Sequence, residues 1–192
     1  MLTPVWDVLV YVVLPLWVLA GFADYLCHRA THIEHANGFK ESLIHWLMLG
    51  EVGVPLLLAV FFKVNALLMA IMVLAFIAHE ITSNIDIRLA TQTREVSAFE
   101  QQVHSLLEML PFTAMLLVFV LHWPQLLALL GQGGEAAGWT LTLKPMPSLA
   151  ELGLPAIAFA LFVIFPYAEE FIRGWLADRR GDARRTDSLL AP

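Results

Sequence analysis

Five long apolar runs constrain the fold of this 192-residue chain more than any other feature. A helix that crosses the roughly 30 Å hydrocarbon core of a bilayer needs about 20 apolar residues and satisfies its own backbone hydrogen bonds. The runs lack period-two alternation and are too long for barrel strands. The sequence therefore predicts an all-α fold, a polytopic membrane bundle of about five transmembrane helices. The runs lie near Val5–Cys27, Leu43–Phe62, Val64–Ile81, Leu106–Trp123 and Leu149–Phe171.

The overall composition agrees with a membrane location. Hydrophobic residues make up 59% of the chain and charged residues only 15%, with a formal net charge of −6. No basic face is available to follow a phosphate backbone, so we expect no nucleic-acid partner. The single cysteine, Cys27, has no second cysteine in the chain with which to form a disulfide.

The chain divides into one membrane domain and a short tail. Residues 1–176 are predicted to form a single integral membrane helical domain, and residues 177–192 a polar C-terminal tail. The short segment Lys63–Asn65 predicts a tight helical hairpin, and the Gly- and Pro-rich stretch Gly131–Pro147 predicts a loop. Most Lys and Arg residues fall on the cytoplasmic side if the N-terminus is outside. We expect a bacterial inner-membrane protein with a cytoplasmic C-terminus.

Histidines and acids recur at helical spacing at the predicted cytoplasmic ends of the first four spans. Residues spaced by i, i+4, i+8 and i+11 share one face of a helix, and Asp24, His28, His32 and His35 have this spacing. Imidazole nitrogen and carboxylate oxygen suit Fe, Mn and Zn, and helical bundles build dinuclear sites from such side chains. We therefore predict a four-helix metal-binding core at one membrane depth on the cytoplasmic side. Its predicted ligands are Asp24, His28, His32, His35, His45, His79, Asp86, Glu100 and His104.

The stretch Asp24–His32 resembles the first histidine box of the membrane-bound di-iron superfamily of fatty acid hydroxylases, sterol desaturases and fatty acid desaturases. That box reads as an acid followed by His-Arg-x-x-His, which His28, Arg29 and His32 match. The resemblance implies two Fe ions that activate O2, hydroxylation or desaturation of a lipid chain, and a separate electron-donor protein. It also implies that His28 and His32 bind iron.

The sequence departs from that family after the first box. The later boxes contain adjacent histidines, and this chain has no adjacent pair. Carboxylates must then replace the missing imidazoles. The candidates are Asp24, Asp86, Glu100 and Glu80.

Other acids lie within the predicted spans or at their ends. Glu51 lies between Gly50 and Gly53, just before Pro55, which predicts a locally opened helix and a role as a proton relay or a metal ligand. Glu51 and Glu80 are the predicted catalytic residues. The segment Glu169–Arg173 resembles the Glu-Glu-x-x-x-Arg box of prenyl-protein proteases but is one residue short, so we interpret it as a helix-end ion pair.

These features predict an integral membrane di-metal oxidoreductase, most simply di-iron, that uses O2 on a hydrophobic or lipid substrate. Zn or Mn are alternative metals, and a zinc-dependent membrane lipid hydrolase is the rival enzyme. That rival lacks a His-Glu-x-x-His signature in this sequence. A non-enzymatic haem-binding or metal-binding membrane protein is the third alternative.

Overall fold

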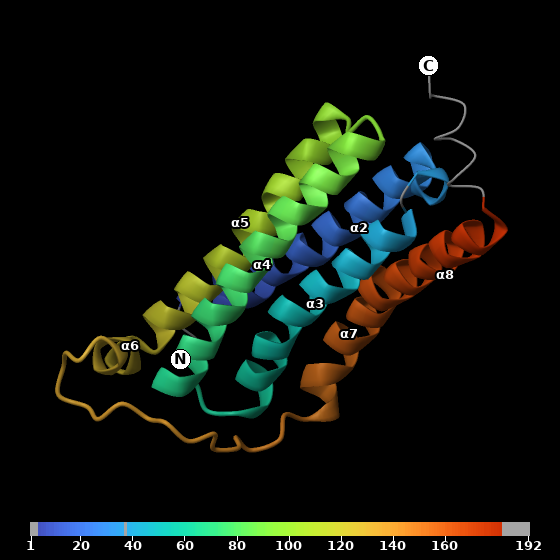
Figure 1. Ribbon diagram of the computed structural model, residues 1–192. Helices are drawn as coiled ribbons and strands as arrows, with labels where there is room; N and C mark the ends of the chain where they lie inside the picture. Colours follow the sequence, from blue (N-terminus) through green and yellow to red (C-terminus); the bar gives the residue numbers. More distant parts are fainter. Residues whose placement is uncertain (1–3, 37, 182–192) are drawn as a thin grey trace.

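The computed structural model describes residues 4–36 and 38–181, and this part of the chain is an all-helical bundle (Figure 1). Five helical segments are long and apolar enough to cross a membrane, which confirms the predicted fold class. Each segment contains most of one predicted apolar run. The segments are Pro4–Thr31, Gly38–Phe61, Ala66–Thr93, Ala98–Leu121 and Leu149–Arg180.

Two of the five spans contain a wide π turn. The elements in chain order are α1 (Pro4–Val8), η1 (Leu9–Val13), α2 (Leu14–Thr31), η2 (Ile33–His35), α3 (Gly38–Phe61), α4 (Ala66–Thr93), α5 (Ala98–Leu121), α6 (Trp123–Leu129), α7 (Leu149–Phe159), η3 (Ala160–Ile164) and α8 (Phe165–Arg180). The π turns η1 and η3 each end two residues before a proline, Pro15 or Pro166. Because proline has no N–H, it interrupts the regular series of backbone hydrogen bonds in the helix. The wide π turn accommodates this interruption without ending the span.

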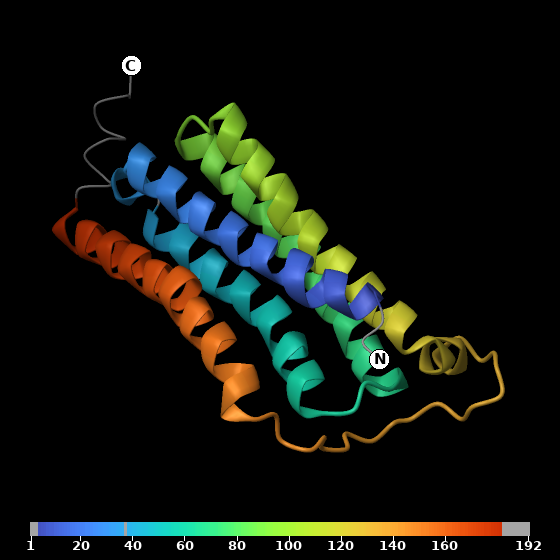
Figure 2. The ribbon, with the colours of Figure 1, turned by 180° about the vertical axis from the view of Figure 1, so that it is seen from behind.

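Neighbouring helices in the bundle are joined mainly by short connections. α3 and α4 form the predicted antiparallel hairpin, α2 packs on α5, and α8 packs on α3. We call one end of the bundle the polar end: it holds the α2–α3 connection, the α4–α5 connection and the last turn of α8 (Figures 1 and 2). α8 continues to Arg180, so the first residues of the predicted tail are helical. Residues 182–192 of that tail lie outside the described residues.

The opposite end is closed by the long connection between α6 and α7. This stretch contains no helix, as predicted, and it pairs with the α3–α4 hairpin through an isolated bridge between Phe62 and Leu143. The Lys144 ammonium donates a 2.6 Å hydrogen bond to the Ala59 carbonyl, and burial lowers the pKa of Lys144. The connection is thus held against the bundle.

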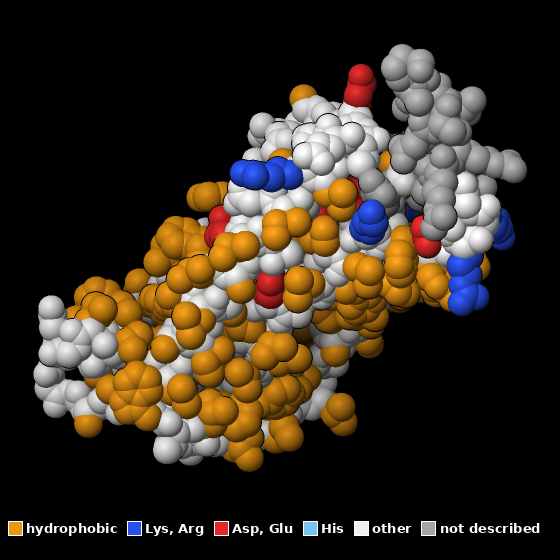
Figure 3. Space-filling view, viewed as in Figure 1, with side chains coloured by type: hydrophobic (Ala, Val, Ile, Leu, Met, Phe, Trp, Pro, Cys, Tyr) orange, Lys and Arg blue, Asp and Glu red, His pale blue; other side chains and the backbone are white. Residues whose placement is uncertain are grey.

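The side chains are distributed as expected for a chain surrounded by lipid. Large apolar side chains such as Leu19, Leu74 and Leu154 face outward, and Figure 3 shows hydrophobic side chains over most of one face, with the charged ones mainly towards the polar end. The interior holds apolar residues towards the opposite end, including Leu68, Met69 and Phe119. At the polar end the interior is instead filled by acids and histidines.

Candidate metal centre

Eight buried polar side chains from five helices meet inside the polar end of the bundle. We call them the acid–histidine centre. The residues are Asp24 and His28 of α2, Glu41 and His45 of α3, Asp86 of α4, Glu100 and His104 of α5, and Glu170 of α8. On α2, α3 and α5 the acid precedes the histidine by four residues, so each helix turns both groups to the same side.

The carboxylate of Glu170 joins two of the histidines. Its Oε2 lies 2.9 Å from His28 Nδ1, and its Oε1 lies 3.0 Å from His45 Nδ1. An ionised carboxylate only accepts hydrogen bonds, so each imidazole carries its proton on Nδ1 and donates it to Glu170. The two rings are stacked, with centroids 4.9 Å apart and planes inclined by 4°. Glu170 therefore fixes the tautomer and the orientation of both rings.

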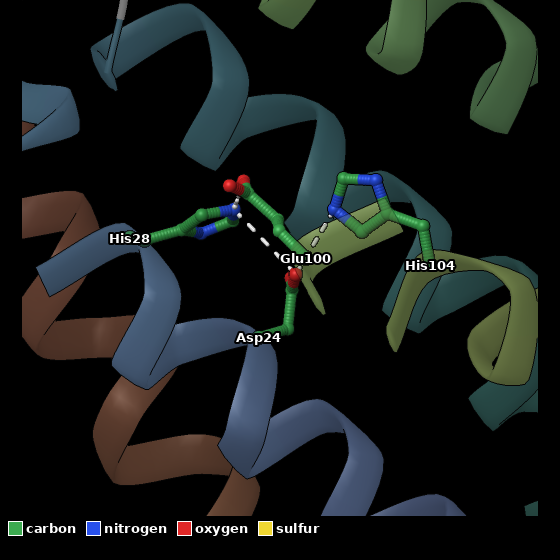
Figure 4. A group of neighbouring side chains, drawn as sticks. All are labelled: Asp24, His28, Glu100 and His104. Carbon is green, nitrogen blue, oxygen red and sulfur yellow. Dashed lines mark ion pairs between the residues drawn. The ribbon is translucent and has the colours of Figure 1, made fainter. Parts of the chain in front are cut away.

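The Nε2 atom of His28 faces the carboxylates of Asp24 and Glu100. It lies 3.6 Å from Asp24 Oδ1 and 3.5 Å from Glu100 Oε1, and His104 Nε2 lies 3.0 Å from the same Asp24 oxygen. Figure 4 shows these four side chains converging from α2 and α5. One donor atom from each lies within 4.8 Å of the others, a spacing that can hold a metal ion.

His45 turns its other nitrogen towards α4. Its Nε2 atom lies 3.4 Å from Asp86 Oδ2. His28 and His45 thus have the same arrangement, in which Nδ1 donates to Glu170 and Nε2 faces a carboxylate. This arrangement matches metal-binding histidines, whose far N–H is commonly held by a carboxylate in an outer shell. His28, His45 and Glu170 also form a second group whose possible ligand atoms lie within 4.8 Å of one another.

A single guanidinium partly balances the acids. Arg94, in the α4–α5 connection, lies 2.6 Å from Glu41 Oε1 and 2.5 Å from Glu100 Oε1. Burial disfavours the cation, but hydrogen bonds and charge interactions with Glu100 and Glu41 outweigh it and raise the pKa of Arg94 above its usual value. Arg94 therefore remains charged, as a bridge between α3 and α5.

Several polar atoms of the centre remain without a hydrogen-bond partner among the described residues. They include Nε2 of His28, Nδ1 of His104, Oδ1 of Asp86 and Oε2 of Glu100. The centre contains five carboxylates, and the guanidinium of Arg94 pairs with two of them, so the remaining buried charge must be offset by protons on the histidines or by bound cations. The donor set of imidazole nitrogen and carboxylate oxygen suits Fe, Mn or Zn. A metal cation would satisfy the orphaned atoms and the charge together.

The structure brings six of the nine predicted ligands into the centre. They are Asp24, His28, His45, Asp86, Glu100 and His104. All six lie near the polar end, which agrees with the predicted common depth.

Two predicted ligands are placed differently because α2 ends early. The expectation that His32 and His35 share one helix face with Asp24 is wrong: α2 ends at Thr31, and His32 adopts a left-handed conformation with φ of 52°. The side chains of His32 and His35 are 71% and 57% exposed, and Glu34 lies within 4.0 Å of both.

The remaining predictions concern the deeper part of the bundle. His79 is buried, but it precedes Asp86 by seven residues and so lies about 10 Å deeper along α4. The predicted opening of α3 near Glu51 is wrong, since α3 is helical throughout, and Glu51 accepts a hydrogen bond from Thr82. Glu80 is partly exposed on α4 and lines a surface groove with Ile81 and Arg88.

The predicted ligands include neither of two centre residues, Glu41, which pairs with Arg94, and Glu170. The ion pair predicted for its segment exists, but between Glu169 and Arg173, 3.4 Å apart, and Arg173 also pairs with Glu34. Glu170 points the other way, into the bundle. The adjacent pair of acids could have indicated this. Consecutive residues of a helix point about 100° apart around its axis, so Glu169 and Glu170 face different surroundings.

A close crossing of α3 and α8 sets the position of Glu170. A Cβ added to Gly174, one turn beyond Glu170, would lie 2.9 Å from the backbone nitrogen of Phe39 and 3.0 Å from the carbonyl carbon of Gly38. These are backbone atoms and cannot rotate away. Only glycine at position 174 allows α8 to approach α3 this closely.

We expect Gly174→Ala to separate α8 from α3 and to destabilise the protein by about 1–3 kcal/mol, the usual cost of overpacking. Movement of α8 also shifts Glu170 away from the two imidazoles, so metal affinity falls with stability. Denaturation in detergent and a metal titration measure the two effects. Gly153→Ala is the matched control, because a Cβ there meets nothing within 4 Å. Equal stability of the two variants would contradict the close crossing.

Arg94→Gln is expected to destabilise the metal-free protein by about 3–5 kcal/mol, because it leaves two buried carboxylates without their cation. Glu41 and Glu100 are fully buried, so water cannot replace the guanidinium. Unfolding measured with a chelator present tests this. Arg88→Gln, at an exposed position of α4, is the control. An unchanged midpoint in Arg94→Gln would show that the pairing adds no stability.

Comparison of the chain with models of protein families, with curated proteins and with solved structures finds no match. The features that indicate a function are therefore the geometry of the acid–histidine centre and the apolar bundle that surrounds it.

Proposed function

We propose that the protein is an integral membrane di-metal oxidoreductase that uses O2 to oxidise a lipid or another hydrophobic substrate. The observation that carries the proposal is the pair of oriented imidazoles, His28 and His45, with Nδ1 held by Glu170 and Nε2 turned to buried carboxylates. Two iron ions would be held by the three imidazoles and by Asp24, Asp86 and Glu100. Bound there, iron supplies the redox chemistry that amino-acid side chains lack.

The chain's own groups have separate roles in this proposal. Glu170 orients the imidazoles, and Arg94 holds Glu41 and Glu100 in place. The surrounding apolar helices keep water from the centre and admit a substrate laterally from the bilayer. Of the segment that resembles the first histidine box of the membrane di-iron superfamily, Asp24 and His28 belong to the centre and His32 does not. Hydroxylation would convert a C–H bond, O2, two electrons and two protons into C–OH and water, with the electrons supplied by a separate donor protein.

The orientation in the membrane is part of the proposal. The distribution of Lys and Arg favours a cytoplasmic polar end. A centre at that end would be accessible to a soluble or membrane-bound electron donor of the cytoplasm, as in a bacterial inner membrane.

The test uses the purified protein in lipid vesicles, loaded with Fe²⁺ and supplied with a chemical reductant and O2. We expect O2 consumption and lipids that have gained one oxygen atom or lost two hydrogens, detected by mass spectrometry. Lipid fragments released without O2 by the zinc-loaded protein would instead support a hydrolase. If the protein bound no metal after iron or zinc was supplied, both the oxidoreductase and the hydrolase proposals would be overturned.

A further inference from the structure

A second group of buried and half-buried polar side chains lies deeper in the bundle than the acid–histidine centre. We call it the inner cluster: Glu51 of α3, His79, Thr82 and Ser83 of α4, and Glu108 of α5. It lies inside the predicted spans, where ionisable groups are costly and usually functional.

Hydroxyl groups of α4 hold both acids of the inner cluster. Thr82 Oγ1 donates a 2.8 Å hydrogen bond to Glu51 Oε1, and Ser83 Oγ donates one of 2.8 Å to Glu108 Oε1. Because Thr82 and Ser83 are consecutive, one reaches α3 and the other α5. Within the described residues, neither acid forms an ion pair with Lys or Arg.

His79 lies one turn before Thr82 and Ser83, the residues that hold these acids, on the same side of α4. It is 4% exposed, its Nδ1 lies 3.8 Å from Glu51 Oε2, and it interacts electrostatically with both Glu51 and Glu108. Neither ring nitrogen meets the distance and angle of a hydrogen bond among the described residues, although the ring interacts with the backbone of Leu107. A distance of 3.8 Å is too long for a hydrogen bond, but one water molecule or a small rotation of either side chain closes it. An imidazole so placed can accept a proton at one nitrogen and release another at the second.

The inner cluster is continuous with the acid–histidine centre along two helices. Glu108 follows His104 by four residues, and Ser83 precedes Asp86 by three, so each lies one turn from a centre residue on the same helix face. Glu51 is the far end of the row and lies towards the middle of the bilayer. Glu80, on the outer side of α4, is the remaining nearby acid.

We propose that His79 is a proton shuttle between Glu108 and Glu51, forming a relay that moves a proton away from the centre when positive charge arrives there. The inference rests on the proposed metal binding. A bound cation favours the ionised form of the nearer acid, Glu108. The proton lost by Glu108 passes through His79 to Glu51, where the Thr82 hydroxyl remains a hydrogen-bond partner.

The test is infrared difference spectroscopy of the metal-free protein in lipid nanodiscs, before and after rapid addition of Mn²⁺. We expect a carbonyl-stretch band of a protonated carboxylic acid to disappear from Glu108 and another to appear at Glu51. Glu108→Gln removes the first band and Glu51→Gln the second. In His79→Gln the second band appears about 100-fold more slowly, the loss expected for a missing acid–base group.

Two further variants make the result specific. Thr82→Val preserves the side-chain shape and shifts the position of the Glu51 band, because its hydrogen-bond donor is lost. Asp178→Asn, an acid-to-amide change at an exposed position of α8, leaves the spectrum unchanged. Stoichiometric Mn²⁺ binding with a spectrum that Glu51→Gln and His79→Gln do not alter would overturn the relay alone. Failure to bind metal would overturn the proposed function and the relay with it.

Discussion

His28→Gln is expected to abolish metal binding at the acid–histidine centre. His28 belongs to both groups of residues that can hold an ion, and its ring is fully buried between Glu170 on one side and Asp24 and Glu100 on the other. Glutamine preserves some of the polarity but offers no imidazole nitrogen. When the metal-free variant is titrated with Fe²⁺ or Mn²⁺, we therefore expect no binding that saturates at a fixed number of ions per chain.

His32→Gln is the matched control for this experiment. It changes the same residue type four positions later, in the segment that resembles the histidine box, but the His32 side chain is 71% exposed beyond the end of α2. We expect normal binding in this variant. Equal losses in the two variants would show that the histidine box acts as a unit and that the geometry of the centre is wrong.

Glu170→Gln is expected to weaken metal binding by about 10–100-fold, the usual effect of losing an outer-shell carboxylate. Glu170 accepts a hydrogen bond from each of two imidazoles, and an amide has a single acceptor oxygen. One ring must lose its Nδ1 partner and is free to rotate or change tautomer. The dissociation constant measured by competition with a chelator reports this effect directly.

The neighbouring substitution Glu169→Gln distinguishes the effect of imidazole orientation from the effect of the protein's net charge. Glu169 faces the other way and pairs with Arg29, whose side chain is 52% exposed. Removal of this acid changes the net charge equally but leaves both imidazoles held. If Glu169→Gln weakened binding as much as Glu170→Gln, the effect would be long-range electrostatics and not ring orientation.

The fold could be predicted from the sequence because apolar runs of this length have few alternatives in a bilayer. Much of the centre could also be predicted, because i, i+4 spacing alone places Glu100 and His104 on one side of a helix. The sequence did not reveal where each helix stops. The spacing predicted that His32 lies on the same helix face as His28, but α2 ends before His32, which adopts a left-handed conformation.

Glu170 could not be assigned from local pattern because its partners lie far away in the chain. It contacts His28 across 142 residues and His45 across 125. Its position depends on a close helix crossing at Gly174, a tertiary feature that periodicity within α8 does not encode. The depth of His79, by contrast, follows from the sequence, because seven residues of one helix separate it from Asp86.

The ratio of metal to protein, measured by elemental analysis on the purified chain after expression in medium supplemented with Fe, Mn and Zn, tests the central claim most directly. Convergence of three imidazoles and several carboxylates predicts about two ions per chain, a number the dinuclear sites of comparable bundles share. Only trace amounts of all three metals, in folded protein that retains its helical content, would contradict the account.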